Sequence, residues 1–379
     1  MKVLGLVLAW ERGKDLANLT KIRASSALPV FGKYRVIDFA LTNMVNAGIS
    51  KIGIITQYNP RSLMDHLGSG KEWDLDRKTG GLFILQPYFS LENRSMGYAG
   101  TADSVFQNMT LFRRGNEDHV LIGSGDHVFR TDYNDLFRSH LESGADMTMM
   151  TAEVEPSELT DGDWMLSSTS SGRVTGWKEY ASQEKDSVAA DSRKIVPLGV
   201  YFINKYLLKE LLYANVPEGK NDLVKDIFVP CSSSITVHEY RFRGYWRNLR
   251  AGIDTYYKTN MDALKDEIRH ELFYEKGTVY TKLKDLPPPK IANTAQIRNS
   301  IIADGSIISG KVENSVLFRN TRVFAGAVVR NSVILESTVI EEGALVENAV
   351  LDKNAIVRSG RSLQGRPNKP ASIEKHGVV

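Results

Sequence analysis

Two aspartates stand where a divalent metal ion and phosphates could be held. Asp126 follows the apolar run His119–Gly123, in the sequence Ser-Gly-Asp-His. An aspartate beside a glycine at the carboxyl end of a strand can hold a Mg²⁺ ion that bridges phosphates. Asp222 could provide a second carboxylate. Each also has a structural explanation, because Asp126 could cap a turn and Asp222 could begin a solvated helix, and the sequence leaves both open.

The loop after the first apolar run does not look suited to phosphate. Val3–Ala9 predicts a buried strand, and the loop after such a strand binds phosphates in nucleotide-binding α/β domains. Phosphates approach bare glycine amides there. In this chain the loop begins with Trp10 and Glu11, and Gly13 is the glycine that remains. An indole fills the space and a carboxylate repels phosphate, so we predict a nucleotide-type scaffold with an unsuitable loop.

Two further stretches could contact a ligand. Gly100 and Thr101 open a predicted helix, whose backbone donors could meet a base or a phosphate. Thr101 could equally be the helix N-cap, with Asp103 favouring the helix dipole. The sequence Gly-Tyr-Trp-Arg at 244–247 is an aromatic patch with one cation, and we interpret it as a packing element under the domain junction rather than a ligand site.

The elements that must position these residues alternate along the first two-thirds of the chain. Such alternation predicts an α/β domain with a mostly parallel sheet and helices on both faces, whose ligands bind at the carboxyl ends of the strands. We predict strands at Val3–Ala9, Lys51–Thr56, Leu82–Gln86, His119–Gly123 and Asp146–Ala152, and helices at Asp38–Ala47, Pro60–Leu67, Thr101–Phe112, Tyr133–Ser143 and Ile253–Tyr274.

The last quarter of the chain has a different character. Asn-Ser-Ile-Ile at 299, Asn-Ser-Val-Leu at 314, Asn-Ser-Val-Ile at 331 and Asn-Ala-Val-Leu at 348 recur at spacings of 15, 17 and 17 residues. Degenerate six-residue units, three per turn, are typical of a parallel β-helix, and a sandwich of short antiparallel strands is the alternative. We therefore predict an α/β domain over 1–250, a helix and Pro-rich linker over 251–290, a β-helix over 291–379 and a loosely ordered tail from Arg361.

The composition excludes some classes of function. The chain has 379 residues, a formal net charge of +3 and dispersed Lys and Arg, which does not favour nucleic-acid binding. The single Cys231 excludes an internal disulfide and fits a reducing compartment. We find no leader sequence and no apolar run long enough to span a bilayer, so we expect a cytoplasmic protein with no membrane partner.

The motifs together resemble the glucose-1-phosphate adenylyltransferases, which make ADP-glucose from ATP and glucose-1-phosphate. The resemblance covers nearly the whole chain, in the family's order and spacing. It implies a Rossmann-like nucleotidyltransferase domain, a C-terminal left-handed β-helix, Mg²⁺ as cofactor and a tetramer. The matching stretches are Arg23–Ala24, Phe31–Phe39, Ile55–Tyr58, Gly100–Val105, Ser124–His127, Gly199–Tyr201, Lys225–Ile227, Gly244–Arg247 and Asn314–Leu317.

The departures from the family fall on positions that the resemblance assigns to ligands. Trp10 and Glu11 replace two glycines of the phosphate loop, and Asp15 replaces an arginine that neutralises the triphosphate. Ser25 replaces a lysine, and Tyr180 replaces the lysine that grips the sugar phosphate. Further departures are Ser26 for Pro, Asp163 for Gly, Val224 for Gly and Asn248 for Asp. Family residues that remain in the nucleotide and sugar pocket are Arg12, Gly13, Gly100, Thr101, Asp126, Glu179 and the candidate metal ligand Asp222.

These departures predict a chain without its own catalysis. One lost donor or cation commonly costs about 10²–10³ in rate, and several losses together should remove nearly all turnover. The chain therefore resembles most the regulatory, non-catalytic subunit type of bacterial glycogen biosynthesis. An active adenylyltransferase that uses Arg12 or Lys14 in a rearranged loop is the main alternative. A β-helix acyltransferase is disfavoured, since the span between His270 and His376 has no histidine to act as base.

The resemblance also implies partners. We expect a catalytic homologous subunit in a heterotetramer, or self-association as a homo-oligomer. We also expect a small-molecule effector, either phosphate or a sugar phosphate. The candidate anion-binding residues near the interdomain region are Lys21, Arg23, Lys33, Arg35 and Arg243.

Overall fold

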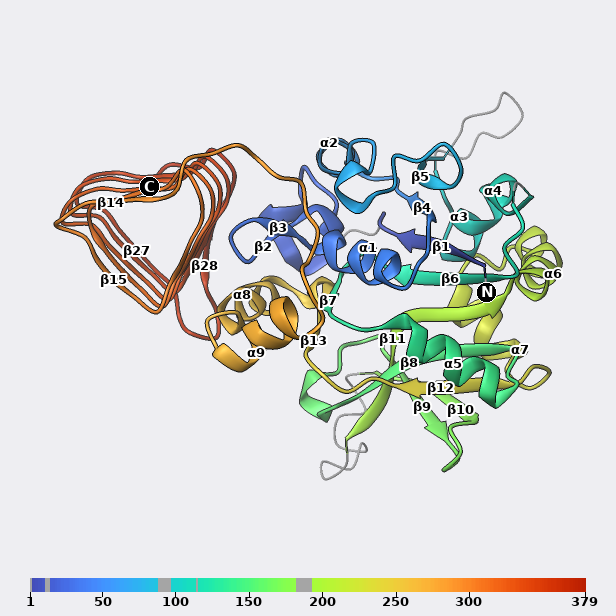
Figure 1. The fold of residues 1–379 in the computed structure, drawn as a ribbon. Helices are drawn as coiled ribbons and strands as arrows, with labels where there is room; N and C mark the ends of the chain where they lie inside the picture. Colours follow the sequence, from blue (N-terminus) through green and yellow to red (C-terminus); the bar gives the residue numbers. More distant parts are fainter. Residues whose placement is uncertain (1, 11–13, 88–96, 114, 182–192) are drawn as a thin grey trace.

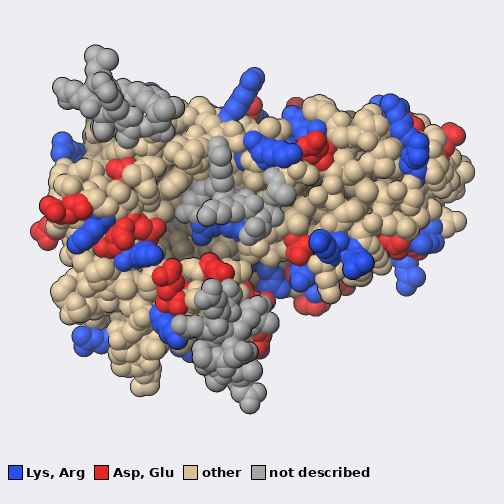
Figure 2. All heavy atoms as spheres, turned by 180° about the vertical axis from the view of Figure 1, so that it is seen from behind, with Lys and Arg blue, Asp and Glu red and all other residues tan. Residues whose placement is uncertain are grey.

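The computed structural model describes residues 2–10, 14–87, 97–113, 115–181 and 193–379. An α/β body carries the N-terminus and a triangular β-helix carries the C-terminus, with α8 (Ile253–Asp262) and α9 (Asp266–His270) lying between the two (Figure 1). In these described ranges, no helix is both long enough and apolar enough to cross a membrane. On the face seen in Figure 2, Lys and Arg lie interspersed with Asp and Glu wherever the described atoms are visible.

The centre of the α/β body is a set of parallel strands. β1 (Val3–Leu8) lies between β4 (Lys51–Ile55) and β6 (His119–Ser124), and β5 (Gly81–Leu85) extends the sheet beyond β4. β1 is apolar at every position, as a strand covered on both faces must be. The predicted α/β architecture with a parallel sheet is confirmed.

The sheet continues past β6 with antiparallel strands that the sequence analysis did not foresee. β11 (Lys194–Asn204) is antiparallel to β6 and to β8 (Met147–Val154). β9 (Trp164–Ser168) pairs with β10 (Val174–Glu179) and with β11, while β12 (Val237–Arg241) runs parallel to β8. The strand predicted at Asp146–Ala152 exists as β8, but it joins this antiparallel extension rather than the parallel centre.

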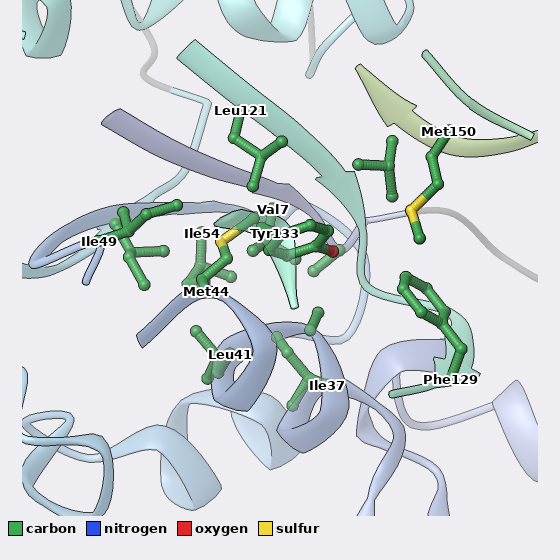
Figure 3. Close-up of a cluster of buried hydrophobic side chains, with 14 of the residues drawn as sticks. Val7, Ile37, Leu41, Met44, Ile49, Ile54, Leu121, Phe129, Tyr133 and Met150 are labelled. Carbon is green, nitrogen blue, oxygen red and sulfur yellow. The ribbon is translucent and has the colours of Figure 1, made fainter. Parts of the chain in front are cut away.

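Helices cover both faces of the sheet, as predicted. Side chains of β1 alternate between the faces, so that Val7 packs with α1 and α2 while Leu4 and Leu6 pack with α3 and α6. Figure 3 shows the first of these clusters, in which Ile37 and Leu41 of α1 lie under the strands. The helices are α1 (Val36–Asn46), α2 (Arg61–Leu67), α3 (Thr101–Gln107), α4 (Met109–Arg113), α5 (Tyr133–Ser143), α6 (Lys205–Asn215) and α7 (Val229–Cys231).

Two predicted helices are interrupted. The helix predicted at Thr101–Phe112 ends as α3 at Gln107, and α4 begins after Asn108, whose side chain bonds back to the carbonyl of Ser104. The single helix predicted at Ile253–Tyr274 is wrong. It is divided into α8 (Ile253–Asp262), α9 (Asp266–His270) and a π-helical turn (Glu271–Glu275), because Leu264 and Lys265 close tight turns onto Met261 and Asp262.

The C-terminal body is a parallel β-helix, as the repeats predicted. Three sheets of short strands stack coil upon coil, and aliphatic side chains fill the interior (Figure 1). The first sheet comprises β14 (Lys290–Ile291), β17 (Ile307–Ile308), β20 (Arg322–Val323), β23 (Val339–Ile340) and β26 (Ile356–Val357). The second comprises β15 (Gln296–Arg298), β18 (Lys311–Glu313), β21 (Val328–Arg330), β24 (Leu345–Glu347) and β27 (Ser362–Gln364). The third comprises β16 (Ile301–Ile302), β19 (Val316–Leu317), β22 (Val333–Ile334), β25 (Ala349–Leu351) and β28 (Ala371–Ile373).

The recurring asparagines form one corner of this β-helix. Asn299, Asn314, Asn331 and Asn348 all have φ between 41° and 48°, a left-handed conformation that asparagine tolerates better than most residues. A serine follows each of the first three asparagines and links the coils, as where the Ser315 hydroxyl accepts from the amide of Ser332 over 3.1 Å. The tail was expected to be loosely ordered from Arg361. That expectation is wrong, because β27 and β28 complete the fifth coil.

The β-helix packs directly onto the α/β body. Val316, Val333 and Val350 of its third sheet are fully buried in a cluster that also contains Phe31 and Tyr257. The hydroxyl of Tyr257 in α8 donates to the carbonyl of Asn331 over 2.6 Å. The junction is therefore an apolar core shared by both bodies.

Candidate functional site

Trp10 lies just after β1, at the edge of the sheet where the parallel strands β1, β4 and β6 have their carboxyl ends. Its ring centroid lies 6.4 Å from that of Tyr58 and 6.3 Å from that of Tyr98, and the half-buried indole packs against the apolar cluster beneath. The indole Nε1 is buried, and none of the residues described accepts a hydrogen bond from it. Trp10 thus belongs to an aromatic cluster at this edge. Glu11, Arg12 and Gly13 lie outside the described residues, and for Asp15 the backbone alone is described, within the 3-10 helix Lys14–Thr20.

Asp126 lies at the same edge, after β6, and is 1% exposed. The hydroxyl of Ser25 donates to its Oδ1 over 2.8 Å. Burial raises the pKa of Asp126 to about 7, against the lowering effect of the Ser25 hydrogen bond. The Arg250 Nε atom lies 3.9 Å from its Oδ2. Asp126 therefore faces a hydroxyl and a guanidinium.

Asp222 acts as a helix cap. Its Oδ1 accepts from the amides of Val224 and Lys225 over 2.9 and 2.8 Å at the start of the π-helical turn Leu223–Phe228. Its Oδ2 accepts from the hydroxyl of Thr101 over 3.2 Å. The first amides of α3 are also engaged, since Ala102 donates to the carbonyl of Asn221 over 2.7 Å. The Gly100–Thr101 turn is thus bound to this segment.

Protein donors engage both carboxylates in this structure. Mg²⁺ needs oxygen ligands with free lone pairs at about 2.0–2.1 Å. Both oxygens of Asp222 accept protein donors, and Asp126 faces Ser25 and Arg250. No group of three His, Cys, Asp or Glu side chains suited to a metal gathers anywhere in the described ranges.

A cavity of about 520 Å³ opens beside Asp126, under β13 (Trp246–Asn248). Trp246, Arg247 and Arg250 line it, together with Asp163. The aromatic stretch at 244–247 is therefore divided in its role. Tyr245 is buried in the junction cluster, as the packing interpretation expects, whereas the next two residues face the cavity.

Tyr180 and Glu179 lie near this cavity with different surroundings. Tyr180 is 2% exposed and packs in an apolar cluster with Leu159 and Val196. Glu179 is exposed, and its carboxylate lies 3.9 Å from the Lys225 ammonium. A lysine at position 180 on this backbone would begin inside an apolar cluster, so the tyrosine serves packing.

A second cavity of about 520 Å³ lies at the junction of the two bodies. Nine Lys or Arg side chains and two carboxylates, Asp65 and Glu336, are among the described residues that line it. Burial alone would raise the pKa of Glu336, but Lys353 and Lys284 outweigh it and lower the pKa to about 2. The cationic residues are Arg23, Lys33, Arg35, Arg61, Lys282, Lys284, Arg319, Lys353 and Lys375.

Three of the five predicted anion-binding residues line the junction cavity, and two lie outside it. Arg23, Lys33 and Arg35 line the junction cavity, and Arg23 is also paired with buried Asp352 over 2.9 Å. Lys21 instead pairs with Glu374 over 2.8 Å, and neither it nor exposed Arg243 is among the lining residues. The six other cations were missed, because they come from the linker, the β-helix and α2 and carry no local motif.

Comparisons with known proteins agree with the fold. Residues 4–266 match the family model described as nucleotidyl transferase, and residues 287–369 match the one described as GlmU-like, C-terminal hexapeptide. Together they define a nucleotidyltransferase domain followed by a hexapeptide-repeat β-helix.

Similar proteins named glucose-1-phosphate adenylyltransferase indicate which nucleotidyltransferases this chain is related to. One from Thermotoga neapolitana is 36% identical over 332 residues, which cover 86% of this chain and 76% of the relative. One from Geobacillus stearothermophilus is 34% identical over 333 residues, covering 87% and 83%, and one from Bacillus cytotoxicus is 35% identical over 329 residues, covering 86% and 85%. The chain belongs to the glucose-1-phosphate adenylyltransferase family.

Proposed function

We propose that this chain is a regulatory, catalytically silent subunit of ADP-glucose pyrophosphorylase, the enzyme that forms ADP-glucose and diphosphate from ATP and glucose-1-phosphate. The observation that carries the proposal is the packing of Trp10 against Tyr58 and Tyr98 at the carboxyl end of β1. A triphosphate would need bare backbone amides at that place. In this chain the indole ring of Trp10 fills that space, and it offers one N–H donor in place of several backbone amides.

Three further features support the same conclusion. Ser25 supplies a neutral hydroxyl to Asp126 where the family resemblance expects a lysine. Asp222 is committed to backbone amides, and Tyr180 is committed to an apolar cluster. Phosphoryl transfer depends on positioned charge, so the substitutions at Ser25 and Tyr180 remove positive charge from the reacting centre, while the retained Asp222 is engaged as a cap.

An activity assay of the purified chain tests the proposal. With ATP, glucose-1-phosphate and Mg²⁺, we expect no ADP-glucose formation above background. A catalytic relative assayed under the same conditions is the positive control. Steady turnover by the isolated chain, removed by Asp126→Asn, would instead favour the alternative of an active adenylyltransferase with a rearranged loop.

The regulatory half of the proposal needs a partner. We expect the chain to assemble with a catalytic homologous subunit, as a heterotetramer, and to change that subunit's maximal rate or effector response. Size-exclusion chromatography with light scattering, followed by kinetics of the mixture, measures both. Separate elution with unchanged kinetics would contradict this role and leave self-association as a homo-oligomer.

We place the effector of this complex in the junction cavity. Its cations outnumber its carboxylates, and guanidinium and ammonium groups bind phosphate strongly. Phosphate or a sugar phosphate there would contact both bodies at once, which couples occupancy to their packing. Inorganic phosphate titrated calorimetrically should bind, and Arg61→Ala with Lys375→Ala should weaken binding, while Arg243→Ala outside the cavity should not.

A further inference from the structure

His66 of α2 forms a buried pair with Asp38 of α1. The His66 Nε2 atom lies 2.5 Å from Asp38 Oδ1, and the two side chains are 6% and 0% exposed. The other carboxylate oxygen, Oδ2, accepts from the amide of Arg35 over 2.8 Å. A hydrogen bond at one ring nitrogen fixes the tautomer, so this network assigns the proton of the neutral ring to Nε2. A further proton would therefore bind at Nδ1.

The same imidazole ring lines the junction cavity. Trp73 packs edge-on against it, with ring centroids 5.8 Å apart and ring planes at 69°. Within the described part of the chain, the ring makes no hydrogen bond besides that to Asp38. Among the described residues that line this cavity, His66 is the one side chain whose ordinary pKa lies between pH 5 and 8. The cavity thus holds many fixed positive charges and one that depends on pH.

The charges that act on His66 come from several elements. Asp38 is its direct partner, Arg35 lies before α1, and Lys282 of the linker donates to the carbonyl of Asp65 over 2.5 Å. Burial lowers the pKa of His66, Asp38 opposes this effect, and Arg35 and Lys282 reinforce it, with a net lowering. The ring of the empty site is therefore neutral at neutral pH. The other charged residues of the cavity are Arg23, Lys33, Arg61, Asp65, Lys284, Arg319, Glu336, Lys353 and Lys375.

A doubly charged anion in this cavity would reverse that balance. It would offset the positive charge of Arg35 and Lys282, and a nearby negative charge favours the charged form of a histidine. The imidazolium donates from both nitrogens, so Nε2 could keep its bond to Asp38 while Nδ1 donates to the anion. Anion binding would then draw in a proton. Affinity would rise as the pH falls through the pKa of His66 in the occupied site, and level off below its pKa in the empty site.

We propose that a dianion of the phosphate class binds in the junction cavity together with one proton on His66, so that this site responds to pH as well as to its effector. The inference rests on the proposed function, which places phosphate or a sugar phosphate in this cavity. His66 joins α2 to α1, and a charged ring makes a stronger hydrogen bond to Asp38 than a neutral one. The effector response of the complex should therefore increase in mild acid.

Calorimetric titration of the full chain with sulfate tests the proposal, because sulfate itself has no protonation step near neutral pH. Two buffers of different ionisation enthalpy at about pH 6 give the number of protons bound with the anion. We expect about 0.5–1 proton per sulfate, and a Kd that weakens about fivefold between about pH 6 and about pH 7.5. His66→Gln keeps a donor for Asp38 but cannot titrate, so it should remove both effects.

Two control variants should keep the proton uptake. His270→Gln removes an exposed histidine of α9 that does not line the cavity, and Asp65→Asn removes the carboxylate next to His66 in the chain. Proton nuclear magnetic resonance of the His66 ring follows the same proton directly, with His66→Gln assigning its signal. Saturating sulfate should raise the pKa of His66 by about one unit.

The outcomes separate this inference from the placement of the effector. Sulfate binding that Arg61→Ala with Lys375→Ala weakens, but that takes up no proton, would overturn this inference alone. Equal proton uptake by a folded His66→Gln variant would do the same. An absence of sulfate binding, or binding that the Arg61→Ala, Lys375→Ala variant retains in full, would overturn the effector site in the junction cavity as well.

Discussion

The hydroxyl of Ser25 donates to Oδ1 of Asp126 over 2.8 Å, between two buried residues that lie 101 positions apart in the chain. The bond joins the segment before α1 to the end of β6. It gives a buried carboxylate a neutral donor, and burial raises the pKa of Asp126 to about 7 against the lowering effect of this bond.

Removing this donor should destabilise the fold. Ser25→Ala leaves a buried acceptor without its partner, which typically costs about 1–3 kcal/mol in the free energy of unfolding. Urea denaturation at neutral pH measures the change. Ser233→Ala, which removes an exposed hydroxyl that donates to the local carbonyl of Pro230 over 3.3 Å, serves as the matched control and should alter stability by less than about 0.5 kcal/mol. Equal effects of the two substitutions would mean that the buried bond contributes nothing specific.

Substitutions of Asp222 can distinguish a helix-capping role of this residue from a metal-binding role. Asparagine also caps helices well, so Asp222→Asn should change the free energy of unfolding by less than about 0.5 kcal/mol, whereas Asp222→Ala should cost about 1–2 kcal/mol. Thermal and urea unfolding of both variants give these values, and repeating them with Mg²⁺ should not alter the difference. A stabilisation by Mg²⁺ that both variants lose would assign Asp222 to a metal instead.

Glu336 should make the fold sensitive to acid. Its pKa is about 2 in the folded chain against 4.5 ordinarily, so between these values the unfolded chain binds a proton that the folded chain does not. Stability therefore falls as the pH drops from about 4.5 towards 2. Glu336→Gln should remove this part of the pH dependence and cost about 1–2 kcal/mol at neutral pH, because Lys353 and Lys284 lose their partner in a site that water partly reaches.

Urea midpoints measured from about pH 7 to about pH 3 follow this effect. Exposed Glu342 lies on the same body, and Glu342→Gln serves as the control. Parallel profiles for Glu336→Gln and the unaltered chain would show that the two lysines do not hold the carboxylate.

Restoring the family residues should recover some activity if only ligand contacts have been lost. We expect measurable ADP-glucose formation from the variant with Trp10→Gly, Glu11→Gly, Asp15→Arg, Ser25→Lys and Tyr180→Lys, well below that of a catalytic relative. Tyr180→Lys puts an ammonium into an apolar cluster, so the variant without it controls for lost stability. Adding Arg250→Ala should raise the recovered rate, because the carboxylate of Asp126 is then open to Mg²⁺. A folded variant with no activity in any combination would show that changes such as Asp163 and Val224 also matter.

Periodicity made much of the fold predictable. The Asn-Ser repeats identified the β-helix, because each marks a left-handed corner that recurs once per coil. The parallel strands were predictable from short apolar runs between helical patterns. The division of α8 from α9 was not, since turns that close onto Met261 and Asp262 leave no proline or glycine as a signal.

The candidate site was predictable only where a residue follows its own strand. Asp126 stands directly after β6, so its place at the strand-end edge could be predicted from local sequence. Arg250 could not be, because it reaches Asp126 through the pairing of β13 with β7 (His127–Phe129) across more than a hundred residues. The junction cavity was recognised in part, since its remaining cations meet only when the β-helix docks.

The shared apolar core at the junction limits how this protein can be dismantled. Val316, Val333 and Val350 point out of the β-helix. They are nevertheless fully buried, because they pack with Phe31 and Tyr257 of the other body. Cutting the chain at the linker and separating the two bodies would expose an apolar surface to solvent on each of them. The two bodies are therefore expected to fold as one unit. Joining either body to an unrelated domain would require a new apolar surface to cover these residues.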